Sequence, residues 1–398
     1  MKTRLILLVF TAQSKHLKGF MMIIKKLDVY PLEFLEAVDN YSTRYVVLVR
    51  VEAQDGTVGW GECFSLFREA TAAIAALITA GLGDIVVGKD AYDIETHWQA
   101  MRERAWWYGD AGGIAAFAIS AIDMALWDLK GKLLKLTLSQ MLGGNQVESL
   151  PVCASSHPKA AKIEDMAEEL AGHIRAGFKF VKVGFGKKGE ANLGVDAERD
   201  IYFVKTVRAA IGPDAGFIVD VGARCRWDVP RAVYTAQAMH AHKLTWLEDP
   251  FHPDNANGFH RLRAAVPGMR IGFGERLYNV YDYKRALEAD VCDVLLIDAG
   301  RAEGVTGMWK VIQMAARHNV AINAHSFSSA INTAASIHLS LCAPLRILFE
   351  LKPMETAMHH ELVRNPVWHV HGYIHAPQGY GLGVDVMEEA VEKFMVRF

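Results

Sequence analysis

Beyond about residue 148, short apolar runs alternate with amphipathic helical stretches, and this alternation constrains the fold more than any other feature of the chain. Eight runs have the length and composition of strands: PVCASS, FKFVKV, GFIVDV, LTWLED, RIGFGE, VCDVLLID, VAINAH and LRILFE. Strands that alternate with helices pair in parallel, because parallel neighbours need a crossover connection. Eight evenly spaced units predict a (β/α) barrel, since an open doubly wound sheet rarely supplies so many.

The chain before residue 148 has a different pattern. From Ile23 to Asp55 apolar and polar residues alternate as in strands, and Asp55-Gly56 reads as a hairpin turn into TVGWGE. From Glu69 to Leu142 apolar residues recur at helical spacing, and we expect the helical segment AISAIDMALWDLKGKLLKLTLSQMLGG to end at Gly143-Gly144. Strands followed by helices predict a separate α+β part.

Polar or charged residues stand at the ends of seven runs in succession. A strand often ends in a polar residue because it emerges into a loop, but this does not readily explain seven in a row. In a barrel the carboxyl ends of all strands meet on one face, where barrel enzymes build their active sites. The residues predicted to meet there are Lys182, Asp220, Glu248, Glu275, Asp298, His325 and Glu350.

Three of these residues favour a metal site. Asp220, Glu248 and Glu275 end three consecutive runs. Hard oxygen ligands that leave coordination positions open suit Mg²⁺, and three close carboxylates repel one another without a cation. The scattered histidines lack an H-E-x-x-H spacing and no Cys–His cluster offers a softer site.

The next two run ends supply an Asp and a His. An Asp beside a His fixes the imidazole tautomer and supports its protonated form, so His325 with Asp298 is a candidate general base and acid. A buried core histidine is the alternative interpretation of His325. No G-x-S-x-G motif occurs, which argues against a hydrolytic triad. Lys182 enters from the opposite side of the barrel and could contribute positive charge.

These motifs resemble the mandelate racemase and muconate lactonizing enzyme branch of the enolase superfamily over essentially all of Ile23 to Phe398. The resemblance rests on the order and spacing of GWGE, AIDMALWDLKGK, FIVD, WLEDP, GFGE, IDAGRAEGVTG, INAH and PQGYGLGVDV. It implies an α/β fold, a TIM-like (β/α)7β barrel with an α+β N-terminal capping domain. The expected parts are an extension at 1–21, the capping domain at 22–147, the barrel at 148–370, and a segment at 371–398 that returns to the capping domain.

The resemblance also implies roles for single residues. Asp220, Glu248 and Glu275 become Mg²⁺ ligands, and His325 with Asp298 becomes the catalytic dyad. Lys182 matches the first lysine of the family's K-x-K motif, and Glu350 matches an acid that donates a hydrogen bond to the substrate carboxylate. A homo-oligomer is the family expectation.

Two departures from the family pattern guide the choice of reaction. The second lysine of K-x-K is Gly184, and the asparagine of D-x-N is Gly222. Racemisation by two bases needs a proton donor on each face of the intermediate, so loss of the lysine favours chemistry from one face by His325. We therefore expect a dehydratase that converts an acid sugar, an aldonate or aldarate, into a 2-keto-3-deoxy acid. A racemase, epimerase or cycloisomerase of the same superfamily is the alternative.

The segment WLEDP followed by FHPDN resembles the acid-sugar dehydratases and indicates an acid sugar as the substrate class. Cationic side chains near the run ends could bind distal hydroxyls or a second carboxylate, although each could equally be a solvated loop charge: Lys187, Arg224, Arg226 and Arg276. The capping loops near Phe34 to Tyr41 and Phe64 to Arg68 should tune the size and polarity of the site.

Two other classes compete. Residues 184–189 form a G-x-G-x-x-G pattern after a predicted strand, with Glu198 and Asp200 downstream, as in nicotinamide-binding dehydrogenases. Against this, ANLGVD intervenes before a convincing helix at Ala197 to Ala210. Gly184 and Gly222 also fit a non-catalytic binding or assembly relative, but the intact carboxylates and dyad argue against it.

Composition argues against nucleic acid and a membrane as partners, and the small carboxylate substrate is what the resemblance implies. A net charge of −2 leaves no basic footprint for nucleic acid or for an anionic membrane, and the apolar stretch Ala70 to Gly83 is too short and Ala-rich to span a bilayer. Five scattered cysteines without a C-x-x-C pair favour reduced thiols in a cytoplasm. Leu5 to Phe10 faintly resembles a secretion signal, but no clear cleavage site follows, and Met21 or Met22 is a plausible working start.

Overall fold

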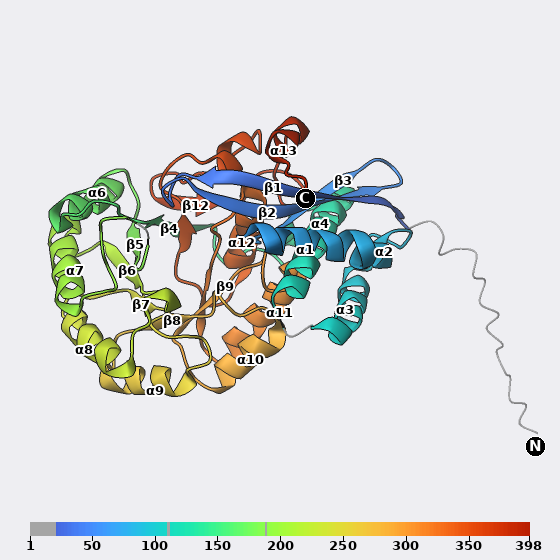
Figure 1. The fold of residues 1–398 in the computed structure, drawn as a ribbon. Coiled ribbons are helices and arrows are strands. Elements are labelled where there is room, and N and C mark those ends of the chain that lie inside the picture. Colours follow the sequence, from blue (N-terminus) through green and yellow to red (C-terminus); the bar gives the residue numbers. More distant parts are fainter. Residues whose placement is uncertain (1–20, 110–111, 188) are drawn as a thin grey trace, which may run out of the picture.

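The computed structural model describes residues 21–109, 112–187 and 189–398, so the expected N-terminal extension and its signal-like run lie almost wholly outside the described residues. Figure 1 shows a ring of strands surrounded by helices, with an antiparallel sheet and its helices packed against one side. This arrangement confirms the predicted α/β barrel with an α+β N-terminal part.

The N-terminal sheet consists of β1 (Ile24–Glu36), β2 (Ser42–Ala53) and β3 (Val58–Cys63), paired antiparallel in that order. The predicted hairpin turn at Asp55-Gly56 is confirmed: Gly56 has a φ of 88°, and the Ala53 amide donates to the Thr57 carbonyl across the turn. The GWGE motif therefore lies on β3, with its Glu62 fully buried.

Helices follow the sheet, as predicted, but the strongest one ends early. They are α1 (Arg68–Leu77), the π-turn η1 (Ile78–Leu82), α2 (Gly83–Val86), α3 (Ile94–Ala105), the 3₁₀ turn η2 (Trp106–Tyr108), α4 (Ile114–Leu134) and α5 (Leu138–Met141). The prediction that one segment continues to Gly143-Gly144 was wrong. Lys135 takes a left-handed conformation with a φ of 55°, and Thr137 forms a capping box with Gln140 that starts α5.

Residues Arg68–Val86 run as one helical stretch that is long and apolar enough to cross a membrane by length and composition alone. Core helices of globular proteins meet the same criterion, and here α1 packs against α4 and β2. The stretch is thus longer than the apolar segment recognised in the sequence.

All eight predicted barrel strands are present and parallel. They are β4 (Ser149–Ser156), β5 (Phe180–Gly184), β6 (Gly216–Asp220), β7 (Trp246–Glu248), β8 (Ile271–Phe273), β9 (Val294–Ile297), β10 (Ala321–Ala324) and β11 (Phe349–Leu351). Their order is β10-β9-β8-β7-β6-β5-β4-β11, and a bridge between Ile322 and Arg346 brings the two ends of the sheet together. Each strand therefore neighbours the next in sequence, as a barrel requires.

Helices cover the outside of the barrel. They are α6 (Ile163–Arg175), α7 (Ala197–Ile211), α8 (Val229–His240), α9 (Ala256–Ala265), α10 (Val280–Glu288), α11 (Gly304–Arg317) and α12 (Ala330–Cys342), with a 3₁₀ turn η3 (Ala223–Cys225) after β6. Their apolar faces bury against the strands. In α6, for example, Met166 and Leu170 stand one helical turn apart on the same face, and both lie in the core.

The C-terminal chain touches both parts of the molecule. After the π-turn η4 (Ala357–Glu361), β12 (Tyr373–His375) pairs antiparallel with β4 of the barrel. Helix α13 (Glu388–Phe394) packs on β1, and the Val396 amide donates to the Pro31 carbonyl. The chain end thus reaches the N-terminal sheet, while the domain limits given above stay a prediction.

Candidate active site

Three carboxylates meet where neighbouring barrel strands end. Asp220 is the last residue of β6, Glu248 the last of β7, and Glu275 follows β8. One carboxylate oxygen from each lies within 4.8 Å of the others. Glu248 is fully buried, whereas the side chains of Asp220 and Glu275 are both 14% exposed and open toward solvent. The side chains that the sequence placed at a metal site are therefore together.

Lys182 lies among carboxylates on the β5 side of this group. It sits within β5 rather than at its end, and its Nζ is 2.5 Å from Glu248 Oε1, 3.1 Å from Glu350 Oε2 and 3.8 Å from Asp220 Oδ2. Burial opposes the charge of the Lys182 ammonium, but these carboxylates outweigh burial and raise its pKa well above the usual value. Lys182 is thus a buried cation whose contacts are already taken.

Glu350 also lies within its strand, β11, and accepts a hydrogen bond from Asn323 Nδ2 at 3.0 Å. With Lys182 as its second partner, Glu350 acts here as an acceptor. Its expected role as a donor to a substrate carboxylate stays a prediction.

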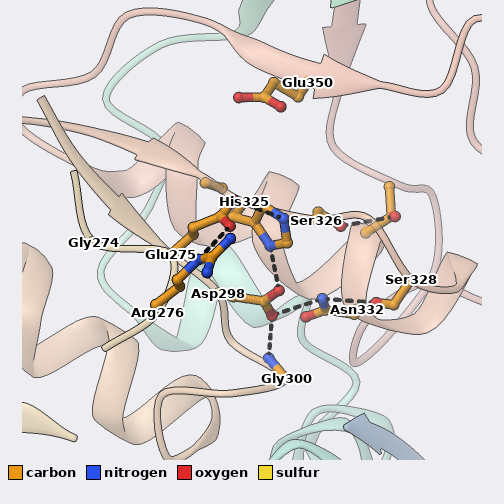
Figure 2. A network of polar contacts seen from close by, with 12 residues as sticks. Gly274, Glu275, Arg276, Asp298, Gly300, His325, Ser326, Ser328, Asn332 and Glu350 are labelled. Carbon is orange, nitrogen blue, oxygen red and sulfur yellow. Dashed lines mark hydrogen bonds and ion pairs between the residues drawn. The ribbon is translucent and has the colours of Figure 1, made fainter. Parts of the chain in front are cut away.

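The Asp and His follow β9 and β10, and they are paired. His325 Nδ1 is 2.6 Å from Asp298 Oδ2, and His325 Nε2 is 3.4 Å from Glu275 Oε2 (Figure 2). Burial would lower the pKa of His325, but the charges of Glu275 and Asp298 raise it overall. The imidazole therefore lies between its orienting carboxylate and the three-carboxylate group, not in the apolar core.

A further residue that the sequence did not single out orients Asp298. Asn332, in the first turn of α12, donates from Nδ2 to Asp298 Oδ1 and to Ser328 Oγ, each at 3.0 Å (Figure 2). The Gly300 amide donates to the same Oδ1 at 2.8 Å. Glu62, on β3 of the N-terminal sheet, accepts from the Asn332 amide at 3.0 Å and so links this sheet to the dyad. Only tertiary packing brings residues this far apart in sequence together.

Replacing Asn332 with Ala is expected to lower turnover about 10- to 100-fold, the equivalent of a lost hydrogen bond to a charged group worth about 1.5–3 kcal/mol. The decrease should appear in kcat, and the pH profile of kcat should shift, because Asp298 would hold the imidazole of His325 less firmly in this variant. Asn365→Ala, which removes side-chain hydrogen bonds to Gly383 and Asp385 far from the dyad, serves as the control. An unchanged pH profile in Asn332→Ala would contradict the assigned orientation.

Asp249, one residue beyond Glu248, is a second residue that sequence reasoning passed over, although it lies in the quoted WLEDP motif. Both of its carboxylate oxygens are buried without a hydrogen-bond partner among the described residues, and its φ is 42°. Burial, followed by the charges of Glu275 and Asp220, raises its pKa well above the usual value. Arg276 lies 4.0 Å from Asp249 Oδ2, but four carboxylates this close together are still an environment that a divalent cation stabilises, and the oxygen-only donor set fits Mg²⁺.

Asp220, Glu275, Glu350 and His325 line one cavity of about 930 Å³. All four cations proposed from sequence line it, together with two that were missed, Arg44 and Arg301. The expected capping loops contribute as well, through Asp39 from the first and Phe64, Leu66 and Phe67 from the second. A polar cavity of this size suits a hydroxylated small molecule.

The G-x-G-x-x-G segment does not have the geometry of a dinucleotide site. After β5 the chain forms a loop, and α7 begins only at Ala197, capped by Asp196, whose side chain accepts from the Arg199 amide. In a dinucleotide fold the helix starts within the glycines and directs its amides at the pyrophosphate.

A barrel with a cap, converging carboxylates and a His–Asp pair at its mouth is the architecture of a metal-assisted acid–base enzyme. The chain belongs to the enolase superfamily, in its mandelate racemase and muconate lactonizing enzyme branch. Residues 165–390 match the family described as enolase C-terminal domain-like, and residues 23–143 match the mandelate racemase/muconate lactonizing enzyme N-terminal domain.

Relatives of the chain carry different reaction names. The chain is 28% identical to the D-galactarolactone cycloisomerase of Agrobacterium fabrum, over 91% of this chain and 94% of the relative. It is 29% identical to the D-galactonate dehydratase of Ralstonia nicotianae, over 87% and 90% respectively. A racemase from Streptomyces coelicolor with bound magnesium superposes with a TM-score of 0.83 at 26% identity, covering 94% of this chain and 100% of that one.

Proposed function

We propose that this chain is a Mg²⁺-dependent dehydratase of acid sugars, aldonates or aldarates, that forms a 2-keto-3-deoxy acid. The observation that carries the proposal is the contact of His325 with both Asp298 and Glu275 at one cavity. This contact puts the candidate base, His325, next to the candidate cation site. The dehydratase names among the relatives support the same reaction class.

Asp220, Glu248 and Glu275 would hold the cation. A divalent ion at this position would supply positive charge to the carboxylate of the substrate, which gains negative charge as the neighbouring carbon loses its proton. Glu248 is further restrained by Trp246, whose Nε1 donates to Oε2 at 2.9 Å. A ligand restrained in this way keeps its orientation when the substrate enters.

His325 would take the proton from the carbon next to the substrate carboxylate. Asp298 would stabilise the imidazolium that forms and, by accepting from Nδ1, would leave Nε2 as the nitrogen that takes the proton. The buried Lys182 ammonium, 3.8 Å from Asp220 Oδ2, would contribute positive charge beside the developing negative charge. Loss of the neighbouring hydroxyl as water then gives an enol, which tautomerises to the 2-keto acid.

A cycloisomerase or an epimerase is the second candidate, because a cycloisomerase and a racemase are among the relatives reported above. These reactions also begin with abstraction of the proton next to the carboxylate. They differ in the fate of the oxygen on the adjacent carbon and in the return of a proton. Gly184 stands where the family has the second lysine of K-x-K, which favours the dehydratase over a racemase that uses that lysine as its second base.

The test is a panel of aldonic and aldaric acids incubated with Mg²⁺ in deuterated water. A dehydratase forms a 2-keto acid, whereas an epimerase returns deuterated substrate or its epimer without loss of water. A cycloisomerase forms an isomer of its substrate without releasing water. Neither turnover nor deuterium uptake across the panel would reject the catalytic proposal altogether.

Removal of divalent cations is expected to abolish formation of the 2-keto acid, and added Mg²⁺ should restore it. Because Mg²⁺ binds the folded state, it should also raise the melting temperature, by the equivalent of about 2.7 kcal/mol at 100 times its Kd. Calorimetry with chelator-treated protein measures this shift independently of activity. A melting temperature that does not respond to Mg²⁺ would argue against the carboxylate site.

A further inference from the structure

Residue 184 is a glycine, and the side chains of two other residues occupy the space that a side chain at this position would fill. Gly184 and Lys182 share one face of β5, because alternate residues of a strand point the same way, so a side chain at 184 would project into the cavity mouth. A Cβ there would lie 2.6 Å from Lys187 Cε, 2.8 Å from His157 Cδ2 and 3.0 Å from His157 Nε2. Lys187 and His157 therefore occupy the space that residue 184 leaves open.

The glycine-rich loop explains how Lys187 reaches this position. Gly186 has a φ of 65°, which turns the chain back over the end of β5, and a Cβ on it would lie 2.8 Å from Cys225 Sγ. The loop is fixed at its base, since the Phe185 amide donates to the Asp220 carbonyl at 2.7 Å. The glycines at 184 and 186 thus allow Lys187 to turn back toward the cavity.

Lys187 differs from Lys182 in its partners. Lys182 is buried among carboxylates, whereas no hydrogen bond or ion pair among the described residues involves the Nζ of Lys187, which lines the cavity and is exposed. Its ammonium is thus available to a substrate and can exchange protons with solvent.

His157 completes the surroundings of Lys187. Its Nδ1 is 3.4 Å from Asp39 Oδ1 of the first capping loop, and its ring packs against Phe327 at 5.4 Å between centroids. Burial, and then the charge of Lys187, lower the pKa of His157 well below its usual value. Lys187 is thus the exposed, cationic side chain of the pair, and His157 lies beside it with its side chain only 11% exposed.

The two candidate proton-transfer groups flank the carboxylates. The three carboxylates come from β6, β7 and β8; His325 and Asp298 follow β10 and β9 on one side, and Lys187 and His157 follow β5 and β4 on the other. A substrate carboxylate seated near Asp220, Glu248 and Glu275 would have a base on one flank and a free ammonium on the opposite flank.

We propose, resting on the dehydratase function, that Lys187 is the general acid that protonates the departing hydroxyl. His325 takes the proton from the carbon next to the carboxylate, and the electron pair of that C–H bond moves into the substrate carboxylate to give an enediolate. In the later step this electron pair returns to form the C=C bond. The C–O bond of the adjacent carbon breaks with its electron pair on oxygen, which receives a proton from Lys187 Nζ and leaves as water. Lys187 is left neutral and regains its proton from solvent.

Lys187→Met keeps the aliphatic stem beside Gly184 and removes the proton. It is expected to lower 2-keto acid formation by about 10²–10⁴-fold, the range for loss of one acid–base group. Solvent deuterium exchange next to the carboxylate, which needs only His325, should stay within about threefold of the unsubstituted enzyme, because general acid catalysis acts on the later C–O step. A β-fluoro analogue of the substrate, whose leaving group needs no proton, should be turned over by Lys187→Met at nearly the unsubstituted rate.

Two further variants separate the acid role from charge and folding. Arg226→Met removes another cavity cation, so it should raise KM without changing the ratio of elimination to exchange. Gly184→Ala keeps Lys187 but puts a Cβ in its space, so it should lower elimination more than exchange. Melting temperatures of all variants identify any that fail to fold.

The outcomes distinguish the two proposals. If the unsubstituted enzyme forms no 2-keto acid from any acid sugar, the dehydratase function is wrong. If it does, and Lys187→Met loses elimination and exchange equally, loses neither, or is equally slow with the β-fluoro analogue, then Lys187 is not the acid. Full activity of Gly184→Ala would likewise overturn the assigned position of Lys187.

Discussion

His325→Asn is expected to lower both 2-keto acid formation and deuterium exchange next to the carboxylate by at least about 10²–10⁴-fold, because it removes the only base that the proposal provides. The effect on exchange distinguishes this variant from Lys187→Met. Asparagine keeps a polar side chain of similar reach beside Asp298, so packing of the β10 end should survive. Mg²⁺ should still raise the melting temperature, since the three carboxylates remain.

The measurement is deuterium uptake into recovered substrate, followed by NMR, with a parallel assay of 2-keto acid. His318→Asn, at the exposed end of α11, is a matched control that changes a histidine outside the cavity. Full dehydration by His325→Asn would show that His325 is not the base.

Glu248→Gln is expected to weaken Mg²⁺ binding about 100-fold or more. Replacing a residue that only orients a metal ligand lowers metal affinity by up to about 100-fold, and loss of the ligand itself should lower it at least as much. Activity should fall together with metal affinity and recover in part at high Mg²⁺. The substitution also leaves the buried Lys182 ammonium without its nearest carboxylate, at 2.5 Å. Stability in the absence of metal should therefore fall as well, since an unpaired buried charge is unfavourable.

Isothermal titration with Mg²⁺ and activity measured over a range of Mg²⁺ concentrations test this expectation. Glu288→Gln provides a control in which an exposed carboxylate paired with Lys284 is neutralised far from the cavity. If Glu248→Gln bound Mg²⁺ as tightly as the unsubstituted chain, Glu248 would not be a ligand.

Much of the site could be anticipated because parallel strands impose a simple rule. Every strand of a barrel ends on the same face, so residues at the ends of neighbouring runs must lie close together wherever they stand in the sequence. Asp220, Glu248 and Glu275 came together for this reason, and so did Asp298 and His325. The same rule placed Lys182 and Glu350 near the centre, although both lie inside their strands.

The rule does not extend to loops and caps. Asn332 reaches Asp298 from the start of a helix, and Glu62 reaches Asn332 from another sheet, so neither contact follows from strand periodicity. The early end of α4 at Leu134 was missed for a related reason. A left-handed Lys135 stops the helix, and this local backbone choice leaves the apolar spacing unbroken.

The amino-acid sequence by itself determined the barrel, the cap and the identity of the groups that gather at the mouth, because strand and helix periodicity are properties of the local chain. It also revealed that position 184 lacks a side chain. Only the tertiary structure decided what stands there instead. The direction of Lys187 depends on a loop reversed at Gly186 and fixed against Asp220, and its neighbour His157 comes from a different strand. Such placement arises from packing between distant segments, which no local pattern records.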